Sequence, residues 1–133
     1  MADAQIKIII GELEGVAEKV IKALTLEVTA EVQEATPIDT GWARANWVPK
    51  IGEPDSAPRP KDVASLGSRQ AEQQKGVAEV TSGYKLDRGL VSISNNVPYI
   101  QRLNEGSSKQ APAAFVQLAI SRAVQKVARK KFS

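Results

Sequence analysis

The sequence contains neither cysteine nor histidine, and these absences exclude much of the chemistry found in small proteins. Without cysteine there is no disulfide scaffold and no thiol nucleophile. Without histidine there is no Ser-His-Asp triad, and the usual zinc sites lack their ligands. We therefore expect neither a structural zinc site nor catalysis of the common nucleophilic kinds.

Long apolar runs are also missing from the sequence. The run Ile8-Ile9-Ile10 is followed at once by Glu12 and Glu14, and no basic segment precedes it. Neither a signal peptide nor a transmembrane helix is therefore predicted. We expect a protein that is made and kept in a cytosol, without membrane contact.

What the chain does contain is typical of one globular domain over residues 1–133, with 42% hydrophobic and 25% charged residues. The net charge of +3 is too small to indicate nucleic-acid binding by itself. The basic excess nevertheless gathers near the C-terminus, where no carboxylate lies close in sequence. We interpret this cluster as a solvated helix end favoured by the helix dipole, with a DNA-facing surface as the alternative. Its members are Arg122, Lys126, Arg129, Lys130 and Lys131.

Residues 3–35 show the three-and-four spacing of apolar residues that indicates one long amphipathic helix, which Thr36-Pro37 ends. About 32 residues at about 1.5 Å each span roughly 48 Å. A compact chain of this length has a diameter of roughly 36 Å. The helix should therefore project from its own domain and pack against another subunit, unless the fold is elongated. The candidate interface residues are Ile6, Ile9, Ile10, Leu13, Trp42 and Trp47.

The rest of the sequence predicts shorter elements and one further long helix. Gly67 and Gly76 weaken the middle helix, and the three prolines of residues 52–61 indicate a mobile surface loop. Together these elements predict a small α+β domain, with helices on one face of an antiparallel sheet of two or three strands. The elements are a short turn at 42–46, a strand at 47–51, a helix at 62–80, a strand at 90–94, one or two helical turns at 98–103, and a C-terminal helix from Pro112 to Lys130.

Two motifs invite a chemical interpretation. Asp39-Thr40-Gly41 is the tripeptide of aspartic proteases, which would require a homodimer here, but a helix cap and tight turn explain the same residues. Glu105-Gly106-Ser107-Ser108-Lys109 is a weak candidate for an anion-binding loop, and a surface turn is the simpler interpretation. The carboxylates show no metal-ligand spacing. We expect a protein that has no cofactor and is not an enzyme.

Two longer segments carry a family resemblance. The stretch 36–44 and the stretch 95–113 resemble, in order and spacing, the minor tail or tail-completion proteins of lambda-like and related siphophages. The likeness covers nearly the whole chain from Thr36 onward. It departs at Asn104-Glu105-Gly106, where many relatives carry Glu-Tyr-Gly or Glu-Phe-Gly, so the aromatic residue before the glycine is missing. The turn residues that carry it are Pro37, Asp39, Thr40, Gly41, Asn96, Pro98, Tyr99, Gly106, Ser108, Lys109, Gln110 and Pro112.

The resemblance implies a structural virion protein at the head-to-tail junction. On this hypothesis the chain is made in the bacterial host cytoplasm and forms a homo-oligomeric ring, which we expect to be a hexamer, at the head-proximal end of the tail. Its neighbours would be proteins such as a tail terminator or a head-completion protein. The alternatives are a DNA-contacting protein that uses the basic C-terminal helix and, more remotely, a homodimeric aspartic protease.

Overall fold

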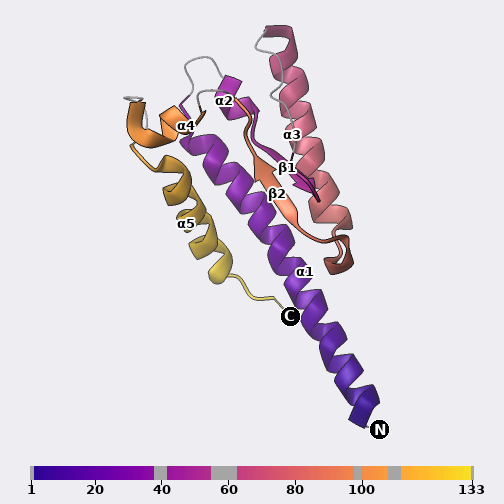
Figure 1. The fold of residues 1–133 in the computed structure, drawn as a ribbon. Coiled ribbons are helices and arrows are strands. Elements are labelled where there is room, and N and C mark those ends of the chain that lie inside the picture. The colour runs from indigo at the N-terminus through magenta and orange to yellow at the C-terminus, as the bar shows by residue number, and fades with distance from the viewer. Residues whose placement is uncertain (1, 38–41, 55–62, 98–99, 108–111, 133) are drawn as a thin grey trace.

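The computed structural model describes residues 2–37, 42–54, 63–97, 100–107 and 112–132. For residues 2–6, 8, 9, 42, 45, 63–72 and 107 it describes the backbone alone. The fold is α+β, as the sequence predicts (Figure 1). Its elements are α1 (Ala2–Ala35), α2 (Trp42–Ala45), β1 (Val48–Ile51), α3 (Val63–Gly83), η1 (Leu86–Arg88), β2 (Val91–Ser94), α4 (Ile100–Arg102), the π-helical η2 (Leu103–Ser107) and α5 (Phe115–Ala128).

The long helix α1 runs through the whole molecule, and the predicted helix over residues 3–35 is confirmed to within one residue. It ends at Thr36, whose hydroxyl donates a 2.5 Å hydrogen bond back to the Val32 carbonyl, and Pro37 follows. In Figure 1, α5 lies along one side of α1, while the sheet and α3 lie on the other. α1 is thus the element on which the others assemble.

β1 and β2 form a two-stranded antiparallel sheet, with Pro49 paired to Ile93 and Lys50 to Ser92. Cross-strand partners point to the same face of a sheet. Ile93 packs into the core cluster formed with α1, and Pro49 abuts α3 at Gly76. Both helices therefore lie on one face of the sheet, as expected from the sequence.

The core lies where α1, the sheet and α5 meet. Its centre is formed by Val32, Trp47 and Ala119, with Val28 and Ile93 among the residues packed around it. α5 meets α1 through a stripe of buried residues spaced four apart, two of which are alanines that let the helix backbones approach closely. The stripe consists of Phe115, Ala119, Ala123 and Val127.

Several predicted boundaries are wrong in detail. The last helix begins at Phe115 rather than Pro112, because Ala114 adopts a left-handed conformation (φ 61°) that cannot continue a helix. It ends at Ala128 rather than Lys130, and β2 begins at Val91, which leaves Leu90 outside the strand. Residues 55–61 of the predicted mobile loop lie outside the described residues.

Two glycines in helices should respond oppositely to alanine. A Cβ atom at Gly76 would lie 2.6 Å from the Pro49 carbonyl oxygen, whereas one at Gly15 would meet nothing within 4 Å. Gly76→Ala should lower the free energy of unfolding by about 1–3 kcal/mol through overpacking. Gly15→Ala should raise it by up to about 1 kcal/mol through helix propensity. Urea unfolding followed by circular dichroism would measure both, and equal effects would contradict the close approach of α3 to β1.

Candidate assembly site

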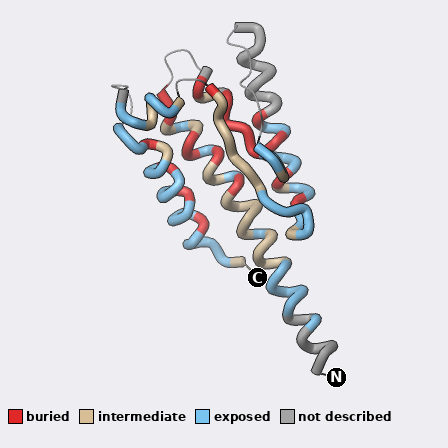
Figure 2. The backbone as a smooth tube through the Cα atoms, viewed as in Figure 1, coloured by how far each residue is buried: buried red, intermediate tan, exposed pale blue. Residues whose placement is uncertain are grey.

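The N-terminal end of α1 projects beyond every other described element (Figures 1 and 2). Glu18 fastens the helix to η1, because its carboxylate accepts a 3.2 Å hydrogen bond from the Leu86 N–H and pairs with Lys85. Beyond that point, residues 10–14 are all exposed. Ile10 and Leu13, two of the predicted interface residues, are 48% and 64% exposed. The side chains of Ile6 and Ile9 lie outside the described ones.

Two grooves flank α1 above this projecting end. One lies between α1 and α3, has a volume of about 570 Å³, and is named here the α1–α3 groove. Its lining mixes polar side chains, including Gln33, Gln73 and the buried Thr29, whose hydroxyl has no partner among the described residues, with apolar ones. The apolar members are Leu26, Ala30, Val77 and Ala78. The other groove, of about 290 Å³, lies over α1 beside β2 and is named the α1–β2 groove. It is lined by Ile21, Leu24, Thr25, Val28, Tyr84, Gly89, Leu90, Val91 and Ile93.

The interface prediction for Trp47 needs correction, whereas that for Trp42 stays a prediction. Trp47 is only 6% exposed, and its indole Nε1–H donates a 2.7 Å hydrogen bond to the hydroxyl of Thr36. Its backbone carbonyl accepts a 2.6 Å hydrogen bond from the buried amide of Gln73 on α3. Trp47 is therefore a core residue that joins α1, α5 and α3. Its ring packs in the core with Val32 of α1 and Ala119 of α5, and its backbone carbonyl is hydrogen-bonded to α3. The side chain of Trp42 lies outside the described ones.

The turn motifs are only partly described. Asp39, Thr40 and Gly41 of the first motif lie outside the described residues, whereas Pro37 is buried at the end of α1. From the second segment, Pro98, Tyr99, Ser108, Lys109 and Gln110 also lie outside the described residues. Pro112 is exposed and precedes α5, and Asn96 is half-buried. Gly106 adopts φ 101°, which favours glycine, and a Cβ atom there would lie 3.2 Å from that of Ala113.

Asn104 caps α5 from outside the helix. Ala114 occupies the N-cap position and has no side-chain cap. The Asn104 side-chain oxygen instead accepts a 2.9 Å hydrogen bond from the Val116 N–H, and its backbone carbonyl accepts one of 2.5 Å from Ala114. Its amide donates to the Gln117 side chain. The residue thus satisfies donors that a helix start leaves unpaired.

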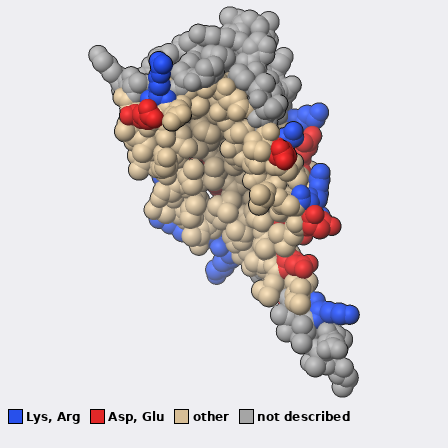
Figure 3. Space-filling model, viewed as in Figure 1, with Lys and Arg blue, Asp and Glu red and all other residues tan. Residues whose placement is uncertain are grey.

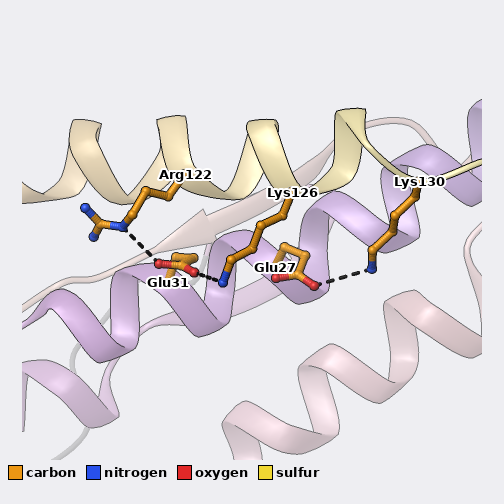
Figure 4. A network of polar contacts seen from close by, with 5 residues as sticks. All are labelled: Glu27, Glu31, Arg122, Lys126 and Lys130. Carbon is orange, nitrogen blue, oxygen red and sulfur yellow. Dashed lines mark hydrogen bonds and ion pairs between the residues drawn. The ribbon is translucent and has the colours of Figure 1, made fainter.

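The basic cluster of α5 faces carboxylates that come from α1 (Figure 4). Glu31, a buried residue, pairs with Arg122 at 3.1 Å and with Lys126, and Glu27 pairs with Lys130 at 3.4 Å. The sequence-based view that no carboxylate lies near this cluster is therefore wrong in three dimensions. Arg129 and Lys131 are exposed at the end of the chain.

These ion pairs displace two pKa values in the directions expected for opposite charges. Hydrogen bonds from Lys126 and Arg122 hold the pKa of Glu31 below its ordinary value of 4.5. The same contact raises the pKa of Lys126 above 10.5. The sequence signal for the network is its spacing, since Glu27 and Glu31 lie four residues apart and so do Arg122, Lys126 and Lys130, the last of which lies just beyond α5.

The described part of the chain offers little to bind a metal ion, because no three acidic side chains in it come together as ligands. No helix in the same part has the length and apolar character needed to cross a bilayer.

Comparison with protein-family models, curated proteins and solved structures finds no match to this chain. Because no relative indicates a function, we infer one from two surfaces: the exposed apolar residues of α1 and the α1–β2 groove.

Loss of the Asn104 cap should destabilise the protein without removing any core atoms. We expect Asn104→Ala to lower the free energy of unfolding by about 1 kcal/mol. Asn104→Asp keeps the acceptor oxygen and adds a negative charge near a helix start, so it should retain most of the stability. Urea unfolding at neutral pH would compare them, and an unchanged midpoint for Asn104→Ala would show that the cap contributes nothing.

The contacts of Glu31 with Arg122 and Lys126, named here the Glu31 network, should make stability depend on pH in a predictable direction. Because the folded pKa of Glu31 is lowered, its contribution is present above its ordinary pKa and is lost as the pH falls below about 4.5. Glu31→Gln should therefore reduce stability at pH 7 and flatten the decline between neutral and acidic pH. The matched control is Glu79→Gln, which alters an exposed carboxylate of α3. Unfolding midpoints from pH 7 to pH 3 test this, and parallel curves for wild type and Glu31→Gln would refute it.

Proposed function

We propose that the chain is a structural subunit of a long-tailed bacteriophage that assembles into a homo-oligomeric ring at the head-proximal end of the tail. The observation that carries the proposal is the projecting end of α1, with Ile10 and Leu13 exposed on it. An assembly role explains this end because burying such side chains stabilises an association by about 1.5–3 kcal/mol each when burial is complete.

The resemblance of the turn segments supports this particular kind of assembly. In the described part, the motif residues shape turns: Pro37 follows the end of α1, and Gly106 adopts the left-handed conformation beside Ala113. These roles direct the chain from α1 to the sheet and from β2 to α5. Turns that set the geometry of a scaffold are consistent with a virion component rather than a catalyst.

The proposed partners follow from the same reasoning. A projecting end that contacts a different surface on the next copy makes a head-to-tail interface, which closes into a ring when the rotation permits. A hexamer matches the symmetry of the tails of the phages that the chain resembles. Tail terminator or head-completion proteins would then lie above or below the ring, in a virion assembled in the host cytoplasm.

DNA contact through α5 is a weaker candidate. Glu31 and Glu27 pair with three of the five exposed cations of the cluster, and Arg129 and Lys131 have no such pair within the described part of the chain. Carboxylates beside the cations reduce the positive potential that nucleic-acid binding needs. A protease based on Asp39 has no observation in its favour within the described residues.

Deletion of the gene tests the proposal directly. We expect filled heads and separate tails that do not join, or tails with a defective end, as seen by electron microscopy of the lysate. Supplying the wild-type gene in trans should restore joined particles. A normal yield of infectious particles from the deletion would contradict the proposal.

A further inference from the structure

The chain carries two apolar surfaces that have no partner within the described residues. The first is the α1 tip, defined here as residues 7–14, on which Ile10 and Leu13 are exposed. The second is the α1–β2 groove, where Leu90 is 80% exposed. We propose that the α1 tip of one copy lies in the α1–β2 groove of the next. This inference rests on the self-association that the proposed function requires.

The α1–β2 groove has the shape and lining that an apolar helix needs. Its floor is the α1 face that carries Leu24 and Val28, and one wall is formed by β2 and Leu90. On α5, Val116 packs into the core beside Ile93, and Ile120 and Val124 follow at four-residue spacing. Ile120 and Val124 therefore share a face of α5 with Val116, and both are exposed there, although no residue of α5 lines the groove itself. Figure 3 shows the middle of this face uncharged and hollowed, with charged side chains toward its margins.

The larger α1–α3 groove is a poorer match for the tip. Its lining sets the polar side chains of Gln33, Gln73, Gln74 and Thr81 among apolar ones such as Leu26 and Val77, whereas the lining of the α1–β2 groove is apolar except for Thr25 and Tyr84. Placing leucine and isoleucine side chains over these groups would remove water from amides and hydroxyls without offering them a hydrogen-bond partner. Apolar side chains therefore favour the α1–β2 groove over the larger one.

The tip cannot occupy the groove of its own chain. Residues 7–14 and the groove floor at Ile21 to Val28 belong to one continuous helix, α1. To fold back, the helix would have to break between them, with loss of several backbone hydrogen bonds. The occupant is therefore the tip of a second copy, and the two contacting surfaces differ. Such a head-to-tail contact repeats from copy to copy, as a ring requires.

Charge supports the same pairing. The tip carries exposed Glu12 and Glu14 and one exposed cation, Lys7, so two acidic groups outnumber one basic group. Arg129 and Lys131 are exposed just beyond the C-terminal end of α5. Lys130, between these two cations, pairs with Glu27 on α1, which places this end of α5 close to Leu24 on the groove floor. Opposite charges at the rim would steer the incoming tip and fix its direction.

One such contact is small. The part of α1 from Ala2 to Gly15 is roughly 21 Å long and about 10 Å wide, so it covers less than the ~800 Å² per partner of a standard interface. Two isolated copies should therefore associate weakly, and closure of the ring should supply the remaining stability. We expect monomers at low concentration and cross-linkable oligomers at high concentration.

The absence of native cysteine makes the contact testable by site-directed cross-linking. Leu13→Cys in one tagged chain is mixed at high concentration with Leu90→Cys in a second chain of different size, and a bis-maleimide with a span of about 10 Å is added. Leu13, Leu90 and the control position Leu26 are all exposed, so the cysteine substitutions leave the core intact. The matched control is Leu26→Cys, which lies in the α1–α3 groove. We expect cross-links from Leu13→Cys to Leu90→Cys at about ten times the yield of those to Leu26→Cys.

A second variant checks the energetic basis of the contact. Adding Leu13→Asp to the analogous pair Ile10→Cys and Leu90→Cys should reduce the cross-linked yield about tenfold, because a charge would enter an apolar groove. Adding Leu118→Asp, which alters an exposed leucine of α5 outside the groove, should leave the yield unchanged.

The outcomes separate this inference from the proposed function. Cross-links mainly to Leu26→Cys, or only between two Leu13→Cys chains, would overturn the groove assignment and leave a ring subunit in place. A chain that stays monomeric at millimolar concentration in light scattering, with no cross-links, would overturn the inference. A normal yield of infectious particles from the gene deletion would instead remove the proposed function, whatever the cross-links show.

Discussion

The packing of α5 on α1 is the contact on which the arrangement of the other surfaces depends. Ala119 and Ala123 allow the two helices to approach closely, and the Glu31 network fixes their register by joining one carboxylate to two cations a turn apart. A buried carboxylate is stable only when such partners compensate for the lost water. Ile120 and Val124 lie on the opposite flank of α5 from these cations. They follow Val116, which packs into the core beside Ile93 of β2, at four-residue spacing, so this register places them on the side of α5 toward β2.

α1 is both the foundation of the domain and its projecting arm. Its C-terminal half is covered by α5, the sheet and α3, whereas residues 10–14 are exposed. A single straight helix couples the two regions rigidly, so the position of the tip is set by the packing around Val32 at its other end. A subunit of this shape can reach a neighbour without a flexible linker, which lowers the entropy lost on assembly.

The turn segments do their work through backbone geometry. Gly106 supplies a left-handed conformation, and Asn104 caps α5 across the turn because Ala114 has no polar side chain to do so. Asn104 is thus the residue that fixes the start of α5.

The sequence by itself determined the long α1, the two strands and the α+β class, because apolar periodicity reports which face of a local segment must be buried. It did not determine what buries that face. The partners of Glu31, the burial of Trp47, the cap from Asn104 and the α1–β2 groove all join residues that are distant in sequence. Their positions depend on how the helices pack together, and only the tertiary structure decided them. Local spacing shows which residues share one face of a segment, but it does not show which other segment packs against that face.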